Sequence, residues 1–253
     1  MTERILPVQD PAPAVSPALA NERLIVALDV PSIEQAQALV EELKGLVSFF
    51  KIGLRLHLVP GVHELIAQLL REGNRVFADF KYHDVDETVQ NAVEQAANRG
   101  ITFVTVHGNG STIRAAIRGR RNKDAPKILI ITVLTSLDAA DMKDLGYRCS
   151  VKALVLHRAK MALEAGCDGV IASGLEAEEI RQLAQDRLLI VSPGIRLRDA
   201  STDDHKRPAT PTKAIEAGAD YLVVGRPIIH APNHRHATQR ILEEMQAAFE
   251  KRR

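Results

Sequence analysis

The sequence predicts an α/β protein that folds as a single (β/α)8 TIM barrel. Short runs rich in Val, Ile, Leu and Phe alternate with longer segments of helical period, and this unit recurs eight times from residue 24 without an obvious linker. A doubly wound open sheet is the alternative, but "ALDVPS" follows the first run where that fold needs Gly-x-Gly-x-x-Gly. We therefore expect residues 1–21, which are rich in Pro and Ala, to form a flexible arm, and residues 22–253 to form the barrel.

The predicted strands are short, β-rich and bounded by charged, Gly or Pro residues. In chain order they are "LIVALDV" (24–30), "FFKIGL" (49–54), "RVFADFK" (75–81), "FVTVHG" (103–108), "KILIITVL" (127–134), "GVIAS" (169–173), "LLIVSPGI" (188–195) and "YLVVGRPI" (221–228).

Amphipathic segments such as "SIEQAQALVEELKG" and "GVHELIAQLLREG" lie between these strands and predict helices. Ser32 and Ser111 are candidate N-caps, and Pro211 follows Thr210 where another helix should begin. Several helical segments end in glycine, which is a common helix stop. These glycines are Gly45, Gly73, Gly100, Gly166 and Gly218.

Composition is ordinary for a globular enzyme and excludes several other classes of protein. The chain is 45% apolar and 26% charged, and its net charge of +1 predicts no attraction to nucleic acid or to a membrane surface. The longest apolar-rich run, "ILIITVL", is too short to span a bilayer. Cys149 and Cys167 form neither a zinc-like spacing nor a disulfide framework, so we expect a cytoplasmic protein without a bound metal.

Polar residues recur at the ends of the predicted strands. In a barrel these ends meet at one rim, which is where active sites lie. The residues concerned are Asp29, Lys51, Asp79, Lys81, His107, Thr135, Ser136, Arg196 and Arg226. His107 fits a structural hydrogen bond as well as a substrate contact.

The alternation of side chains along the third strand places Phe77, Asp79 and Lys81 on one face, which we expect to point toward the barrel axis. Asp79 and Lys81 taken alone fit an ion pair that ends a strand, and Asp84 with Glu87 fits a helix N-cap pair. However, oppositely charged residues also end the two preceding strands. A network of four charges is costly to assemble, so we favour a functional site.

The loops after the seventh and eighth strands, "PGIR" and "VGRP", indicate a phosphate site. Gly194 and Gly225 allow the backbone to approach an anion, and Arg196 and Arg226 can each donate paired hydrogen bonds to it. Either arginine alone fits an ordinary surface residue. The long polar loop over residues 197–210 is either a lid or a plain solvated loop.

The segment "DFKYHDVDETV" resembles the signature of the orotidine 5′-phosphate decarboxylase family, and "ALDV", "KIGL", "VTVLTS", "SPGIR" and "VGRPI" follow that family's order. The resemblance covers the chain from about residue 22 to its end. It implies decarboxylation of orotidine 5′-phosphate to uridine 5′-phosphate (UMP), the last step of de novo UMP synthesis, without a cofactor. It also implies a homodimer whose active sites are shared across the interface.

The resemblance also implies a role for individual residues. The catalytic residues would be Lys51, Asp79, Lys81 and, from the neighbouring subunit, Asp84. The substrate-binding residues would be Asp29, Thr88, Thr135, Ser136, Pro193, Arg196, His205, Gly225 and Arg226, with His205 at the position of the family's lid glutamine.

Two other functions fit parts of the pattern. A metal-dependent sugar-phosphate decarboxylase or aldolase-like barrel would use the aspartates to help hold Mg²⁺. A catalytically silent phosphate-binding barrel could have a regulatory role. The intact Asp-Lys-Asp array argues against the silent barrel, because binding alone does not need it.

Overall fold

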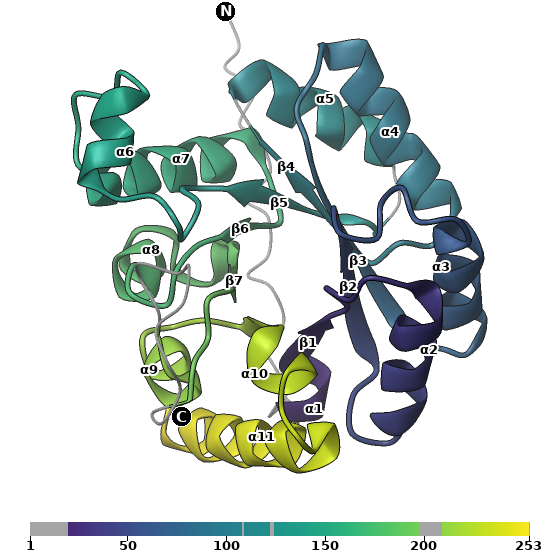
Figure 1. Cartoon of the computed structure of the whole chain (residues 1–253). Coiled ribbons are helices and arrows are strands. Elements are labelled where there is room, and N and C mark those ends of the chain that lie inside the picture. Colours follow the sequence, from purple (N-terminus) through teal and green to yellow (C-terminus); the bar gives the residue numbers. More distant parts are fainter. Residues whose placement is uncertain (1–19, 108, 122–123, 198–208, 253) are drawn as a thin grey trace, which may run out of the picture.

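The eight strands form a closed barrel of parallel strands, in which each strand pairs with the next and β8 pairs with β1 (Figure 1). This computed structural model describes residues 20–107, 109–121, 124–197 and 209–252. The predicted (β/α)8 fold is confirmed, and the alternative prediction of a doubly wound open sheet is wrong. Most of the predicted arm, residues 1–19, lies outside the described residues, while Ala20 and Asn21 already belong to the first helix.

Every predicted strand segment contains a strand, but most of the strands end earlier than predicted. The strands are β1 (Leu24–Ala27), β2 (Phe49–Gly53), β3 (Arg75–Tyr82), β4 (Phe103–Val106), β5 (Lys127–Ile131), β6 (Gly169–Ile171), β7 (Leu189–Ser192) and β8 (Tyr221–Val224). The last segment shows the reason most clearly. Arg226 and Pro227 begin a short helix there, since proline lacks an N–H and suits the first helical turn.

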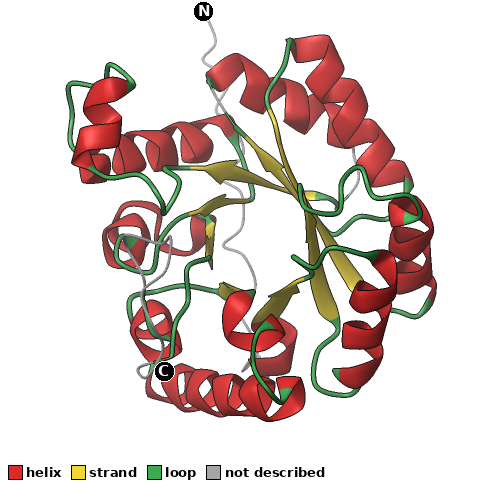
Figure 2. Cartoon of the chain, in the orientation of Figure 1, coloured by secondary structure: helices red, strands yellow, loops and turns green. Residues whose placement is uncertain are grey.

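The helices surround the barrel, as Figure 2 shows. They are α1 (Ala20–Arg23), α2 (Ile33–Glu42), α3 (Val62–Arg71), α4 (Asp86–Asn98), α5 (Gly110–Arg120), α6 (Ala139–Asp144), α7 (Val151–Ala165), α8 (Ala177–Ala184), the 3-10 helix η1 (Gln185–Arg187), α9 (Pro211–Glu216), α10 (Arg226–Ile229) and α11 (His234–Lys251). Among the described helices, none combines the length and the apolar character needed to cross a bilayer.

Helix starts follow the predicted chemistry at two of three positions. Ser32 and Thr210 each accept a backbone N–H of the first turn, as N-caps do. Ser111 does not cap α5, because Asn109 occupies the N-cap position and accepts the N–H of Ser111 itself. The predicted stop glycines all have positive φ, between 76° and 115°, which other residues rarely adopt.

Two apolar layers hold the barrel together. The inner layer fills the barrel and consists of Ile25, Ala27, Phe49, Phe77, Phe103, Leu129, Val191 and Val223. The outer layer lies between strands and helices and includes Val76 and Ala78, with Phe80 packed against it. The predicted alternation along β3 is therefore confirmed. Within the inner layer, the aromatic rings of Phe49 and Phe103 pack against each other with their centroids 5.0 Å apart.

Candidate active site

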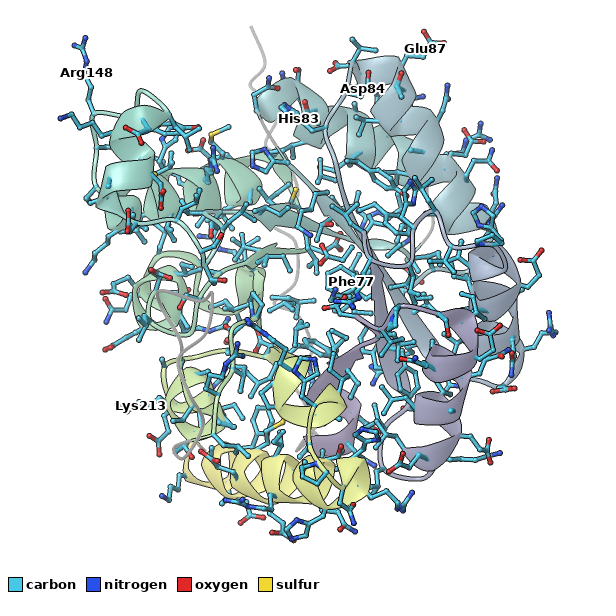
Figure 3. The ribbon with its side chains drawn as sticks, viewed as in Figure 1. Phe77, His83, Asp84, Glu87, Arg148 and Lys213 are labelled. Atoms are coloured by element: carbon cyan, nitrogen blue, oxygen red, sulfur yellow. The ribbon has the colours of Figure 1, made fainter. Side chains whose placement is uncertain are left out.

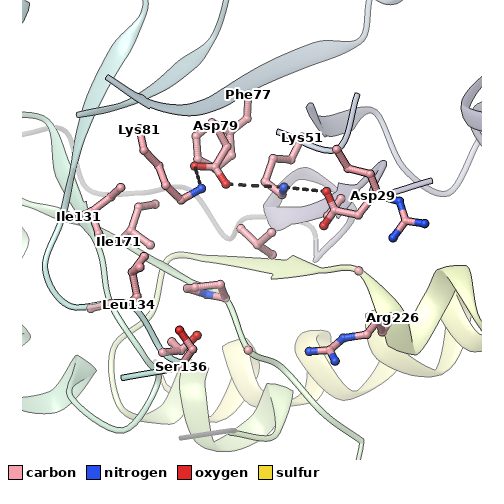
Figure 4. Close-up of a pocket in the computed structure, with 18 of the residues that line it drawn as sticks. Asp29, Lys51, Phe77, Asp79, Lys81, Ile131, Leu134, Ser136, Ile171 and Arg226 are labelled. Atoms are coloured by element: carbon pink, nitrogen blue, oxygen red, sulfur yellow. Dashed lines mark hydrogen bonds and ion pairs between the residues drawn. The ribbon is translucent and has the colours of Figure 1, made fainter. Parts of the chain in front are cut away.

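A cavity of about 530 Å³ opens at the carboxyl ends of the strands. It brings together residues from most of the barrel's circumference. Of the predicted site residues, those that line it are Asp29, Lys51, Asp79, Lys81, Thr135, Ser136, Pro193, Arg196, Gly225 and Arg226. One side carries the acidic and lysine side chains, and Arg226 lies on the opposite side (Figure 4).

Four charges of alternating sign form a row along the first of these sides. The Nζ of Lys51 lies 3.1 Å from Oδ1 of Asp29 and 3.6 Å from Oδ2 of Asp79. The Nζ of Lys81 lies 3.0 Å from Oδ1 of Asp79. Figure 4 shows the row running from Lys81 through Asp79 and Lys51 to Asp29. Because β1, β2 and β3 are consecutive in the barrel, their ends bring these residues together from positions far apart in the sequence.

The inner members of this row are poorly exposed. The side chain of Lys51 is 10% exposed and that of Asp79 is 15% exposed. Burial raises the pKa of Asp79, but the charges of Lys51 and Lys81 and the hydrogen bonds to the carboxylate outweigh it, so the pKa is lowered overall. Asp79 therefore stays ionised and holds two ammonium groups beside the cavity.

The opposite end of the cavity carries the two arginines Arg196 and Arg226, together with Gly194 and Gly225. Gly194, at φ 75°, turns the chain after β7 so that the buried Arg196 lines the cavity. At Gly225 an added Cβ would make ordinary contacts of 3.5 Å with Ala27 and 3.7 Å with Asp29. Contacts of an added Cβ therefore do not explain glycine at residue 225, whereas its backbone conformation, φ −113° and ψ −97°, is one that residues with a Cβ rarely adopt.

Between the two charged ends the wall of the cavity is largely apolar. It includes Ile131, Val133 and Ile171, while the buried Thr135 and the exposed Ser136 add hydroxyl groups. A flat ring with polar edges would suit this middle section, because its faces could pack on apolar side chains and its edge could meet hydroxyls.

Two predicted residues lie away from the cavity of their own chain. Asp84 and Thr88 are exposed and do not line it, and Figure 3 shows Asp84 beside α4, while Phe77 lies in the centre of the barrel. The alternative of an Asp84–Glu87 N-cap pair is wrong, since Val85 occupies the N-cap position without a side-chain bond.

His205 lies outside the described residues, as does most of the predicted lid.

His107 directly follows β4 and does not line the cavity. Its Nδ1 is buried and makes no hydrogen bond within the described part of the chain, and its ring lies 5.3 Å from that of His83. Burial and the charge of Arg158 lower the pKa of His107, so its neutral form is favoured. Among the described residues, the ring therefore shows neither the expected structural hydrogen bond at Nδ1 nor a place in the lining of the cavity.

Sequence reasoning missed two residues that shape the charged row. Thr105 on β4 is fully buried and hydrogen-bonds both Asp79 and the backbone of Lys81. Gly53 on β2 leaves room for the ammonium of Lys51, because an added Cβ would lie 2.7 Å from Nζ. The sequence could have indicated that Thr105 points toward the barrel axis, because it lies two residues after Phe103 on the same face of the strand. A lone threonine in an apolar strand nevertheless says little without its partners.

Among the described residues, no group of three His, Cys, Asp or Glu side chains is arranged to hold a metal ion. The two cavity aspartates pair with lysines instead. Fold and site together define a (β/α)8-barrel enzyme with a lysine–aspartate array at one end of its cavity and two arginines, Arg196 and Arg226, at the other.

Comparison with known proteins gives the family. The model of the orotidine 5′-phosphate decarboxylase / HUMPS family matches residues 22–241, and the chain belongs to this family.

Individual relatives match this chain along nearly their full lengths. The chain is 55% identical to the orotidine 5′-phosphate decarboxylase of Nitrobacter winogradskyi, over 91% of this chain and 95% of that protein. It is 46% identical to the enzyme of the same name from Methylococcus capsulatus, over 92% and 96%. The crystal structure of orotidine 5′-phosphate decarboxylase from Lactobacillus acidophilus superposes with a TM-score of 0.77 at 36% identity, covering 88% of this chain and 98% of that one.

Proposed function

We propose that this chain is a cytoplasmic enzyme that decarboxylates orotidine 5′-phosphate to UMP, the last step of de novo UMP synthesis, without a cofactor. The observation that carries the proposal is the Lys51–Asp79–Lys81 array, whose ammonium groups border a cavity with an anion-binding far end. The names of the relatives described above support the same reaction.

The substrate spans the cavity from one charged end to the other. Its 5′-phosphate binds to Arg196, Arg226 and the backbone around Pro193 and Gly225, where guanidinium groups can donate paired hydrogen bonds. Asp29 holds ribose hydroxyls, since a carboxylate accepts from two O–H groups at once. The resemblance adds His205 as a further contact of the substrate.

The pyrimidine lies in the middle section of the cavity. Its faces pack on the apolar wall, and its polar edge meets Thr135 and Ser136. In this pose C6, which carries the carboxylate, faces Lys81 and Asp79 on the wall of the cavity.

The chemical step needs stabilisation of negative charge at C6. The bond from C6 to the carboxylate carbon breaks, CO₂ leaves, and the electron pair stays on C6. The ammonium of Lys81 stabilises this charge because it is already positioned by Asp79, 3.0 Å away, and needs no reorganisation during the reaction. Lys81 then gives its proton to C6, which yields UMP, and regains a proton from solvent.

Asp79 has two roles in this scheme. Its ionised carboxylate fixes Lys81 and Lys51, and it also faces the departing carboxylate of the substrate. Repulsion between these two carboxylates destabilises the bound substrate. We assign the larger part of the rate enhancement to the stabilisation of charge at C6 by the preorganised ammonium of Lys81.

We also propose a homodimer with shared sites, in which Asp84 and Thr88 reach the partner's substrate. Both are exposed and lie outside their own cavity. Exposed apolar side chains on the two neighbouring loops support such a face: Leu54 is 61%, Leu58 87% and Val85 68% exposed. Burying them against a second copy is favourable, since it removes apolar surface from water.

A direct assay tests the proposed reaction. Purified protein is mixed with orotidine 5′-phosphate, and the ultraviolet change, the UMP formed and the CO₂ released are measured with and without EDTA. We expect UMP and CO₂ in equal amounts under both conditions. Activity that disappears with EDTA and returns with Mg²⁺ would instead support the metal-dependent alternative, and no turnover in either condition would contradict the proposal.

A further inference from the structure

The pairing of β3 with β4 shifts its register at the charged row. Ala78 pairs with Val104, and the next pair is Tyr82 with Val106. Three residues of β3, from Asp79 to Lys81, therefore lie opposite the single residue Thr105 of β4. Such an irregularity re-aims side chains and interrupts the ladder of backbone hydrogen bonds, so the interrupted groups need other partners.

The backbone of Lys81 takes an unusual conformation at this point. Its φ is 55°, in the left-handed region that a residue with a Cβ rarely adopts. Because the register shifts here, the N–H of Lys81 lies outside the regular pairing of β3 with β4. It donates instead to Oγ1 of Thr105 at 2.9 Å. The threonine hydroxyl therefore holds Lys81 in a conformation that it would not readily adopt without this partner.

The same hydroxyl also holds Asp79. Oγ1 of Thr105 donates to Oδ1 of Asp79 at 2.9 Å, and this oxygen also accepts from Nζ of Lys81 at 3.0 Å. A hydroxyl has one proton, and its bond with the N–H of Lys81 uses the oxygen as an acceptor, so that proton is available only for Asp79. Thr105 is fully buried, so water cannot replace either bond without a rearrangement.

We propose that Thr105 is a positioning residue for the decarboxylation, which acts by fixing the backbone of Lys81 and the carboxylate of Asp79 at once. Thr105 does not line the cavity, so it acts through these two residues and not on the substrate. The inference rests on the proposed function. It adds that the proton donor is held through its main chain from the neighbouring strand, in addition to the ion pair of its side chain.

The test compares four variants with the wild type. Thr105→Val keeps the shape and removes the hydroxyl, while Thr105→Ser and Thr105→Ala differ from each other only by the hydroxyl oxygen. Thr238→Val is the matched control. Thr238 is also fully buried, and its hydroxyl donates at 2.8 Å to the backbone of His234, on α11 and away from the charged row.

We expect Thr105→Val and Thr105→Ala to lower kcat at least tenfold with UMP affinity changed less than threefold, because the reacting end is disturbed and the phosphate end is not. Thr105→Ser should retain kcat within threefold of the wild type, and Thr238→Val should leave kcat unchanged. Equal kcat in the Ser and Ala variants would overturn the proposal. This comparison also holds if Thr105→Val fails to fold.

The pH profile separates positioning from a general loss of stability. The charged groups facing Asp79 are Lys51 on β2 and Lys81 on its own strand, and Asp29 on β1 lies beyond Lys51. The hydrogen bond from Thr105 is one cause of the lowered pKa of Asp79, so its removal should raise that pKa. The acid limb of kcat/KM should then move to higher pH in the Ala variant but not in the Ser variant.

Two further measurements distinguish this inference from the proposed reaction. A wild type that forms no UMP would contradict the proposed function. Independently of turnover, a crystal structure of Thr105→Ala tests the positioning itself. We expect Lys81 to leave the left-handed region or Asp79 to change its rotamer. Unchanged positions of both residues would overturn the positioning role.

Discussion

At the scale of single residues, Lys51 has the most demanding surroundings in the site. Its ammonium is nearly buried and lies between the carboxylates of Asp29 and Asp79. A buried charge costs several kcal/mol unless it is paired, so the two carboxylates stabilise the ammonium of Lys51 at this place. The paired geometry also depends on a residue with no side chain, because Gly53 alone leaves space beside Nζ.

Gly53→Ala should therefore disable the array without unfolding the barrel. The new Cβ would lie 2.7 Å from Nζ of Lys51, and the ammonium must move away from Asp29. We expect kcat/KM to fall at least about tenfold, which corresponds to a loss of about 1.4 kcal/mol in transition-state stabilisation. Steady-state kinetics measure the loss, and circular dichroism checks the fold. Wild-type kinetics would mean that the position of Lys51 is not critical.

Lys81→Ala should separate binding from chemistry. The variant keeps Arg196 and Arg226, to which we assign the phosphate, so UMP binding measured by calorimetry should stay within about tenfold of the wild type. Turnover should be undetectable, because neither the stabilising ammonium nor the proton remains. Lys213→Ala, an exposed residue on α9 that is labelled in Figure 3, is the control and should behave as the wild type. Appreciable decarboxylation by Lys81→Ala would end the proton-donor role.

At the scale of elements, the site depends on how strands and helices end. The predicted strand over residues 221–228 ends at Val224, and α10 begins at Arg226. This early turn, made possible by Gly225 and Pro227, brings Arg226 to the cavity. Helix packing shows the same dependence on small residues, since α4 and α5 approach closely at Gly119.

Arg226→Ala tests the contribution of α10 to phosphate binding. We expect kcat/KM for orotidine 5′-phosphate to fall by about two orders of magnitude or more, because the binding energy of the phosphate orders the reacting end. The matched measurement uses orotidine, which lacks the phosphate. With that substrate the variant and the wild type should be equal. A similar loss with both substrates would mean that Arg226 acts elsewhere.

Gly119→Ala tests the packing of α5 on α4. An added Cβ would lie 2.2 Å from the carbonyl oxygen of Gln90 and 3.0 Å from Cβ of Val93, so the helices must separate. Overpacking of this kind costs about 1–3 kcal/mol, which urea unfolding would detect. Gly110→Ala in the same helix is the control, since its Cβ would meet only the end of the Arg114 side chain. Equal stability of the two variants would contradict this account.

At the scale of the whole molecule, the barrel brings the charged row and the two cavity arginines, Arg196 and Arg226, to one cavity, and it leaves Asp84 outside that cavity. The exposed apolar side chains of Leu54, Leu58 and Val85 lie on the loops after β2 and β3. The loop after β2 also contacts β3 itself, where the rings of His57 and Phe80 are 4.8 Å apart. A face of this kind fits association with a second copy better than contact with water.

Mixing two inactive variants tests the shared site. If each site combines Lys81 of one chain with Asp84 of the other, then Lys81→Ala and Asp84→Asn mixed in equal amounts form heterodimers with one intact site. Random exchange makes half of the dimers mixed, so activity should return to about a quarter of the wild-type value. Each variant alone is the control. No recovery, with dimers shown by sedimentation to exchange, would contradict the shared site.

The sequence by itself determined the repeated strand–helix unit and which side of the third strand faces the axis, because both follow from local periodicity. It therefore placed Asp79 and Lys81 at the rim beside Lys51 and Asp29, and Arg196 and Arg226 at the same rim, in the loops after the seventh and eighth strands. It did not reveal the capping role of Asn109 or the early end of β8, where turn chemistry overrides strand propensity.

Only the tertiary structure decided how these charges are held. The register shift between β3 and β4 sets three residues against Thr105, and the left-handed backbone of Lys81 follows from that pairing. The space that Gly53 leaves for Lys51 and the distance of Asp84 from its own cavity also depend on the closed barrel. Residues more than twenty positions apart meet here, and their pairing register is a property of the packed barrel that no local pattern encodes.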